Sequence, residues 1–450
     1  MTILHARTAL LPDGWAQDVR ITVTEGRIAG VQVGVPGADI GCVLAAPVNL
    51  HSHAFQRAMA GMTERRGPGT DSFWTWRDLM YRFLDHLTPD DVQAIAAFVM
   101  MEMAEAGYAA VAEFHYLHHQ PGGAAYADLA EMAGRVAAAA DQTGLGLTLL
   151  PVLYQRGGCD GRALGAGQLR FGNDINRFAD LWAGAVRVCK GLPGDTVVGV
   201  APHSLRAVSA QGLAAVQALA PAAPVHIHVA EQVAEVAEVL AHTGARPVQW
   251  LLENTDLSDR WCLIHATQMD PWETEAMARS GAVAGLCPIT EANLGDGIFD
   301  GVRFLATGGQ FGVGSDSNVR ITLTEELRLL EYSQRLYGRG RAMLASPEKS
   351  TGRVLYEGNL IGSAKAAGRS SGAIRVGACA DLLALDMGAV DLEGRQGDDI
   401  LDALIFAGDD RMVTDLWSAG RHVVTGGRHV ARGAIEAAYR RCMAKLRARL

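Results

Sequence analysis

Residues 43–53 read Val43-Leu44-Ala45-Ala46-Pro47-Val48-Asn49-Leu50-His51-Ser52-His53. The apolar part predicts a buried strand that ends in two histidines. Because alternate side chains of a strand point to one face, His51 and His53 project the same way. Two neutral imidazoles that converge at a strand end suit a zinc-type ion, although a core or surface pair is the alternative for such a motif alone. Ligands at the ends of other strands would decide between the two.

Seven further apolar segments follow this strand, and helical patterns separate them. The expected strands are residues 46–53, 109–115, 147–154, 197–203, 225–229, 261–265, 283–287 and 311–315. The expected helices are residues 90–106, 126–143, 177–189, 210–220, 234–241 and 272–280. Eight strands that alternate with helices predict a (β/α)8 TIM-type barrel. An open doubly wound sheet is the alternative, but no Gly-x-Gly-x-x-Gly opens a helix and no Walker lysine supports it.

The two ends of the chain have a different pattern of short strands and turns. Residues 20–24 and 27–31 flank the turn at 25–26 and predict a hairpin, and a similar texture returns at 373–430. We therefore expect a small β-sandwich domain formed from both chain ends. The expected boundaries are 1–45 and 366–430 for this domain, 46–365 for the barrel and 431–450 for a C-terminal helix.

Composition narrows the class of protein. The chain has 450 residues, a formal net charge of −9 and seven cysteines. An acidic chain argues against a nucleic-acid partner, and scattered cysteines without a Cys-x-x-Cys suit reduced thiols in the cytoplasm. No signal peptide and no apolar stretch of about 18 residues is apparent, so we expect a cytoplasmic protein that does not bind membranes.

Five of the eight expected strands end in histidine and a sixth in aspartate. These residues are His51 with His53, His115, His203, His228, His265 and Asp316. Catalytic groups of such barrels lie at the carboxyl ends of the strands, so this clustering predicts an active site. Lys190 is the only lysine between residues 54 and 340 and ends no strand, so one metal ion is the better expectation than two bridged by a lysine.

Several of these residues could instead have a purely structural role. Of the two histidines on the fifth strand, His228 lies nearer the expected mouth, and we interpret His226 as a packing residue. Glu231 is either an acid at a helix start or a proton-handling group. His265 is either a core residue or part of the site, and Asp316 is either a helix cap or a ligand. Residues 54–89 form a long connection that we expect to act as a substrate lid.

These motifs resemble the amidohydrolase superfamily, with His-x-His on the first strand, histidines on the fifth and sixth, and aspartate on the eighth. The run at 225–231 is similar to the branch of mononuclear-zinc deaminases. Segments 51–57, 72–77, 113–119 and 201–208 look most like the family of N-formimino-L-glutamate deiminases of bacterial histidine degradation.

The resemblance implies a role for each of eleven residues. Zinc, or Fe2+ or another divalent ion, would be held by His51, His53, His228 and Asp316, and catalysis would involve Glu231, His265 and Asp316. Substrate contacts would fall on Gln56, Arg77, Tyr116, His203 and Arg206. The implied reaction converts N-formimino-L-glutamate to N-formyl-L-glutamate and ammonia, and the implied assembly is a homodimer.

Arg77 and Arg206 favour a dicarboxylate substrate over a ring such as a nucleobase. A dicarboxylate needs bidentate cations, and Arg77 and Arg206 are suitable in an otherwise acidic protein. A nucleobase would more readily use aromatic stacking and amide contacts. Another mononuclear-zinc enzyme, such as a guanine- or adenosine-type deaminase or a chlorohydrolase, remains the alternative within the superfamily. A non-catalytic scaffold relative is the alternative outside it.

Overall fold

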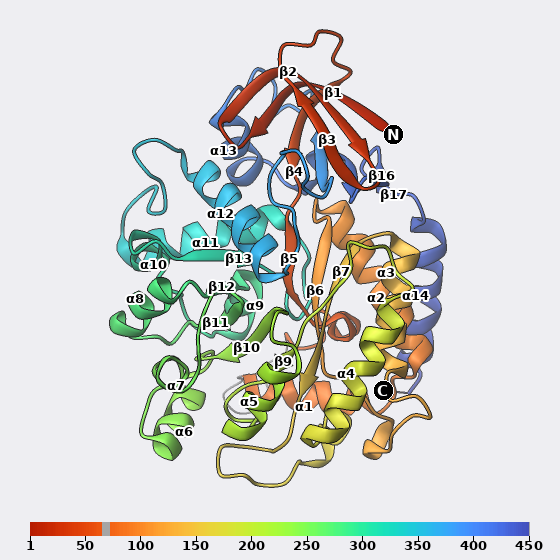
Figure 1. Cartoon of the computed structure of the whole chain (residues 1–450), viewed down its shortest axis with the longest axis vertical. Coiled ribbons are helices and arrows are strands. Elements are labelled where there is room, and N and C mark those ends of the chain that lie inside the picture. Colours follow the sequence, from red (N-terminus) through yellow and green to blue (C-terminus); the bar gives the residue numbers. More distant parts are fainter. Residues whose placement is uncertain (65–72, 450) are drawn as a thin grey trace.

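The computed structural model describes residues 1–64 and 73–449, with side chains in the second range from residue 76 onward. Its larger part alternates strands and helices (Figure 1). The strands are β5 (Val48–Ser52), β6 (Ala110–His115), β7 (Gly146–Leu153), β8 (Val197–Val198) with β9 (Ala201–Pro202), β10 (Val225–Val229), β11 (Trp261–His265), β12 (Val283–Leu286) and β13 (Gln310–Val313). The helices between and after them are α2 (Pro89–Glu105), α3 (Glu131–Thr143), α4 (Ile175–Cys189), α5 (Ala210–Leu219), α6 (Val233–Thr243), α7 (Pro247–Asn254), α8 (Pro271–Ser280), α9 (Pro288–Leu294), α10 (Gly301–Ala306), α11 (Leu323–Gly338) and α12 (Thr351–Ala366).

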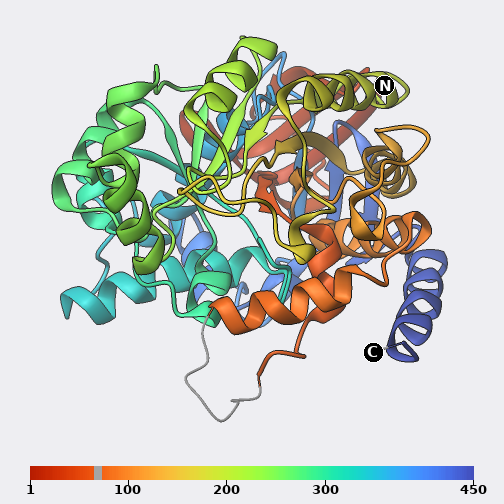
Figure 2. The same cartoon turned by 90° about the horizontal axis from the view of Figure 1, so that it is seen from below.

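Parallel pairing closes these strands into a ring. One series runs β5-β6-β7-β8, with β9 beside β7, and a second runs β10-β11-β12-β13. Parallel bridges join the two series, between Ser52 and Asp316 on one side and between Val200 and Val225 on the other. Seen from below, helices surround the strands (Figure 2). The predicted (β/α)8 barrel is confirmed.

Helix α12 closes the end of the barrel at which the strands begin. The Ser363 hydroxyl accepts a hydrogen bond from the backbone N–H of Val48, and the Ala367 carbonyl accepts one from Thr148. A Cβ on Gly362 would lie 1.9 Å from the carbonyl oxygen of Phe311, so only glycine allows this close approach. Helix α12 therefore covers this end of the barrel.

The two ends of the chain build one eight-stranded sheet, at the top of Figure 1. Its strands are β17 (Arg428–His429), β16 (Arg421–Thr425), β15 (Val413–Ser418), β14 (Leu382–Leu385), β4 (Ile40–Ala45), β1 (Thr2–Leu11), β2 (Gly14–Thr24) and β3 (Arg27–Gln32), in that order. The predicted hairpin joins β2 and β3, and positive φ angles at Glu25 (51°) and Gly26 (76°) suit a tight two-residue turn. This sheet supplies the second, β part of the predicted fold class.

A buried ionic network joins the sheet to the barrel. Arg369 Nε lies 2.6 Å from Asp381 Oδ2, and Arg369 Nη2 lies 2.8 Å from Asp195 Oδ2. Arg421 also pairs with Asp195, at 2.8 Å. The side chains of Arg369 and Asp381 are each 1% exposed. Such pairs are sensitive to the loss of one partner, because the other charge is then left buried and unpaired.

Three helices lie outside the alternating pattern: α1 (Phe73–Leu84), α13 (Asp398–Phe406) and α14 (Arg432–Arg447). Helix α14 packs on α2, where Tyr439 stacks on Phe98 with ring centroids 3.9 Å apart. The long connection at 54–89 contains a 3-10 helix over 54–59 and helix α1, which the sequence did not predict. Residues 65–72 of that predicted lid lie outside the described residues. Within the described residues, no helix is both long and apolar enough to span a bilayer.

Candidate active site

Four candidate metal ligands converge where the barrel strands end. His51 and His53 come from the end of β5, His228 from β10 and Asp316 from the turn after β13. One ligand atom from each lies within 4.8 Å of all the others, and all four residues are buried. The positive φ of Asp316 (44°) places its side chain at this junction. The structure thus brings together the four residues that sequence reasoning selected.

The spacing of these atoms fits a metal ion. His51 Nε2 lies 3.1 Å from His228 Nε2 and 3.4 Å from Asp316 Oδ1, and His53 Nε2 lies 3.3 Å from the same oxygen. With metal–ligand bonds of about 2.1 Å, two ligands of a tetrahedral ion are about 3.4 Å apart. Without an ion, the pair at 3.1 Å makes a hydrogen bond between the two rings; the fit to a metal ion rests on the convergence of all four ligands.

Backbone carbonyls fix the orientation of two rings. His53 Nδ1 donates to the Phe114 carbonyl at 3.0 Å, and His228 Nδ1 donates to the His203 carbonyl at 3.2 Å. Each bond holds the proton on Nδ1 and leaves the Nε2 lone pair free, which is the usual arrangement of a metal-binding histidine.

Burial keeps the three histidine rings neutral, the form in which they can bind a cation. It lowers the pKa of His51 to about 3 and lowers those of His53 and His228 as well, so their rings are neutral. Burial opposes ionisation of Asp316, but its hydrogen bond to His51 and the charges of nearby histidines hold its pKa below the ordinary value. Three neutral imidazoles and one carboxylate are a donor set that suits zinc and similar divalent ions.

Beside this cluster lies a group of proton-handling residues. Glu231 Oε1 is 3.8 Å from His265 Nε2, which is 4.0 Å from Asp316 Oδ2. Burial raises the pKa of Glu231 to about 7. Burial lowers the pKa of His265, but the charge of Glu231 and a hydrogen bond from Nδ1 to Glu291 at 3.3 Å raise it to about 10.

Local structure holds these residues in place. Ala230 adopts a positive φ of 50°, and Glu235 accepts hydrogen bonds from the backbone N–H groups of Ala230 and Glu231 at 3.2 and 3.0 Å. His265 itself has a φ of 69°. Non-glycine residues in this region are strained, and such strain is common at functional sites.

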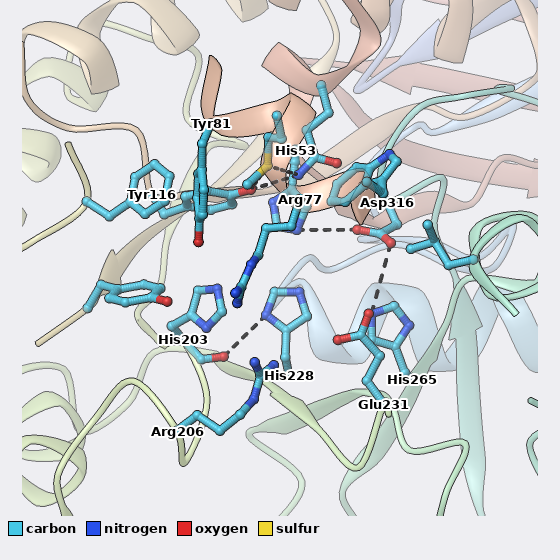
Figure 3. Close-up of a pocket in the computed structure, with 16 residues that line it drawn as sticks. His53, Arg77, Tyr81, Tyr116, His203, Arg206, His228, Glu231, His265 and Asp316 are labelled. Atoms are coloured by element: carbon cyan, nitrogen blue, oxygen red, sulfur yellow. Dashed lines mark hydrogen bonds and ion pairs between the residues drawn. The ribbon is translucent and has the colours of Figure 1, made fainter. Parts of the chain in front are cut away.

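The cluster opens into a pocket that contains all five predicted substrate residues (Figure 3). In the close-up, Arg77 and Arg206 extend toward the space beside His203 and His228 from opposite sides. Arg77 lies on α1, and Arg206 Nη2 lies 4.0 Å from the buried Glu235 carboxylate. The pocket therefore combines a cation-binding cluster with two guanidinium groups.

Gln56 and Tyr116 also line the pocket and contact each other. Gln56 donates to the Tyr116 hydroxyl at 2.7 Å, and that hydroxyl contacts the sulfur of Met80 at 3.6 Å. The Oε1 atom of Gln56 is buried and has no hydrogen-bond partner among the described residues. A buried acceptor of this kind is costly unless a ligand donates to it.

Six further residues line the pocket that the sequence did not single out as substrate contacts. They are Trp76, Met80, Tyr81, Tyr154, Phe171 and Leu294. Tyr154 directly follows β7, so its position at a strand end was the available signal. Trp76, Met80 and Tyr81 lie on α1, within the connection predicted as a lid, whereas no local pattern indicates Phe171 and Leu294.

Other histidines serve the fold. His226 Nε2 donates to the Ala366 carbonyl at 2.9 Å, at the end of the barrel that α12 closes. His118 and His119 contact backbone carbonyls of Val152 and Gly172. None of these three belongs to the four-ligand cluster.

Comparison with known proteins agrees with this geometry. Residues 42–423 match a model described as the amidohydrolase family, and residues 1–39 match one described as the N-terminal domain of formimidoylglutamate deiminase HutF. Formimidoylglutamate deiminase of Pseudomonas aeruginosa is 49% identical over 436 residues, which are 95% of this chain and 96% of that protein.

Solved structures show the same fold. The crystal structure of an amidohydrolase from Brucella melitensis has a TM-score of 0.96 and 50% identity, covering 99% of this chain and 100% of that one. An adenosine deaminase from Xanthomonas campestris with bound zinc has a TM-score of 0.81 at 20% identity, covering 99% and 98%. The second likeness concerns the fold alone.

Proposed function

The chain belongs to the amidohydrolase family, and we propose that it hydrolyses N-formimino-L-glutamate to N-formyl-L-glutamate and ammonia. It is a hydrolase that acts on a carbon–nitrogen bond. The observation that carries the choice of substrate is the approach of Arg77 and Arg206 to one pocket beside the metal-binding cluster (Figure 3). Two cations suit a small molecule with two carboxylates.

We propose that His51, His53, His228 and Asp316 hold one Zn2+ ion. The ligand spacing and the neutral rings support a divalent ion, and the nitrogen-rich donor set favours zinc. When bound, the ion supplies a positive centre that makes water acidic near neutral pH.

The chain's own carboxylates and histidine handle the protons in this proposal. The formimino carbon is a poor electrophile until its nitrogen is protonated, and Glu231 is the acid that donates this proton. His265 and Asp316 would accept the proton of the attacking water, because a cation bound beside His265 would lower its pKa from the raised value that it has without the ion. After attack, the tetrahedral carbon expels ammonia once the terminal nitrogen is protonated. The separation of 3.8 Å between Glu231 and His265 supports proton exchange between them with little movement.

We propose that Arg77 and Arg206 bind the two carboxylates of the substrate. The fully buried carboxylate of Glu235 pairs with Arg206 and helps to fix the position of its guanidinium group. Gln56, Tyr116 and His203 complete the contacts, with the unpartnered Gln56 oxygen as an acceptor for a substrate N–H.

The test is the product pattern of purified, zinc-loaded protein. Incubation with N-formimino-L-glutamate should release ammonia and leave N-formyl-L-glutamate, both measurable by enzymatic assay and mass spectrometry. Formamide with glutamate would show that the other carbon–nitrogen bond breaks. Turnover of adenosine or guanine without turnover of N-formimino-L-glutamate would refute the substrate.

The cellular location and the oligomeric state of the enzyme are also proposals. We propose that it acts in the cytoplasm, which its seven free cysteines support, and that it forms a homodimer. Light scattering on purified protein tests the second point, and a monomeric mass would refute it.

A further inference from the structure

The carboxylate of Asp316 faces two ways. Its Oδ1 atom lies 3.4 Å from His51 Nε2 and 3.3 Å from His53 Nε2, whereas its Oδ2 atom lies 4.0 Å from His265 Nε2. The first oxygen belongs to the four-ligand cluster. The second is therefore available to a separate ion on the side of His265.

A second ligand cluster exists on that side. Ligand atoms of His265, Cys287 and Asp316 all lie within 4.8 Å of one another, and the three residues are buried. Glu231, 3.8 Å from His265, does not belong to this cluster. One imidazole, one thiol and one carboxylate, with a water as the fourth ligand, are a sufficient set for a four-coordinate ion.

The orientation of His265 suits this use. Its Nδ1 donates to Glu291 at 3.3 Å, and Glu291 is anchored by the backbone N–H of Cys287 at 2.8 Å. A carboxylate on one ring nitrogen is the usual partner of a histidine that binds metal through the other. The same glutamate thus places both His265 and the segment that carries Cys287.

We propose that a second Zn2+ or Cd2+ ion binds His265, Cys287 and Asp316, and that it inhibits the enzyme. Binding forms a metal–thiolate bond at Cys287 and releases the protons of the thiol and of the imidazole to solvent. The bound ion occupies the residues assigned to proton transfer, so turnover stops. Inhibition rests on the proposed function, whereas binding of the second ion does not.

This site is selective for ions with high affinity for sulfur. Its three donors include the sulfur of Cys287, and thiolate is a soft ligand that Zn2+ and Cd2+ bind strongly. Mg2+ and Ca2+ prefer oxygen ligands and should not bind there.

The experiment is a Cd2+ titration of full-length protein already loaded with one Zn2+ per chain. The background variant is Cys159→Ser, because Cys159 is the one cysteine of the seven that is not buried. Two readouts are recorded together: the ultraviolet charge-transfer band of cadmium thiolate, and ammonia release. Bound zinc and cadmium are counted by elemental analysis.

The expected result is one further Cd2+ per chain, a thiolate band, and loss of activity in parallel. Adding Cys287→Ala should abolish the band and raise the inhibitory Cd2+ concentration by about tenfold or more, relative to that variant's own activity. Cys262→Ala is the matched control, because Cys262 is equally buried on neighbouring β11 but is absent from the cluster, and it should keep both effects. Cys287→Ser provides a second variant if the alanine protein does not fold.

Three outcomes would overturn the proposal. They are a band that survives loss of Cys287, a band that requires Cys262, and a protein that binds no second ion. A band with undiminished turnover would refute inhibition alone. If N-formimino-L-glutamate is not a substrate, the band and the metal count still decide whether the site exists.

Discussion

Replacement of Arg206 by alanine tests how the pocket recognises its substrate. The guanidinium lies in the pocket, and its Nη2 is 4.0 Å from the fully buried Glu235 carboxylate. The variant removes the cation that we assign to one substrate carboxylate. It also leaves Glu235 without this partner, so folding must be checked by melting temperature.

The size of the effect follows from the hydrogen bonds that alanine cannot make. A bidentate arginine–carboxylate pair has two charge-assisted hydrogen bonds of about 1.5–3 kcal/mol each. The lower value gives about 3 kcal/mol for the pair, which is a decrease of about 150-fold in kcat/KM. We expect most of it in KM, because the carboxylate remains bound throughout the reaction. Arg206→Lys keeps the charge but not the fork, and should have a smaller effect.

Truncated substrates make the test specific. N-formimino-4-aminobutyrate lacks the α-carboxylate, and N-formimino-2-aminobutyrate lacks the side-chain carboxylate. The penalty of Arg206→Ala should disappear for whichever compound lacks the carboxylate that Arg206 binds, and should persist for the other. Arg77→Ala should show the opposite pattern. An equal penalty for Arg206→Ala on all three substrates would refute direct recognition and indicate a structural role.

Four other predictions concern protons, metal and stability. Glu231→Gln should lower kcat by about 100-fold or more while zinc is retained. The pKa of Glu231 is raised to about 7, so the wild-type acid is protonated below that pH and kcat should fall as pH rises through about 7. A rise in kcat would contradict the role of Glu231 as acid. Glu291→Gln should lower kcat by about 10–100-fold with little change in KM, because Glu291 holds the ring of His265. Glu326→Gln is the control, because Glu326 accepts a hydrogen bond from the backbone of Ile289 on the same helix, α9, and it should not lower kcat in this way. Equal losses would indicate a structural effect. Chelation of the metal should abolish ammonia release and lower the melting temperature, and Zn2+ should restore both; unchanged melting would argue against a tightly held ion. Arg369→Met should destabilise the fold by about 3–5 kcal/mol in urea unfolding, because two carboxylates lose their buried partner, and a loss below about 1 kcal/mol would contradict this.

The barrel and the positions of the cluster were accessible from sequence for a physical reason. Strands that are buried on both faces give continuous apolar runs, and β10 and β11 have the predicted bounds of 225–229 and 261–265. Parallel strands end on one face, so polar residues at those ends must approach one another. This is why His51, His228 and Asp316 could be grouped without a structure.

The remaining features depend on packing between distant segments. The fourth strand divides into β8 and β9 at Gly199, where a Cβ would lie 2.8 Å from the Pro224 carbonyl oxygen. Glu235 and Glu291 follow strand ends by several residues, and nothing local indicates that they hold the turn at Ala230 or the ring of His265. Helix α1 was missed because it lies within the long connection at 54–89, which we interpreted as a lid.

The bridge between Ser52 and Asp316 has a consequence for how the protein is made. The backbone N–H of His53 donates to the Asp316 carbonyl, and the N–H of Asp316 donates to the His51 carbonyl, both at 2.9 Å. The first and last barrel strands therefore join at the residues of the cluster itself. On the ribosome, the complete ligand set forms only after the eighth strand has emerged, so the nascent chain cannot assemble this site earlier. In the finished protein, slow exchange of these two amide protons would report ring closure and cation binding at once.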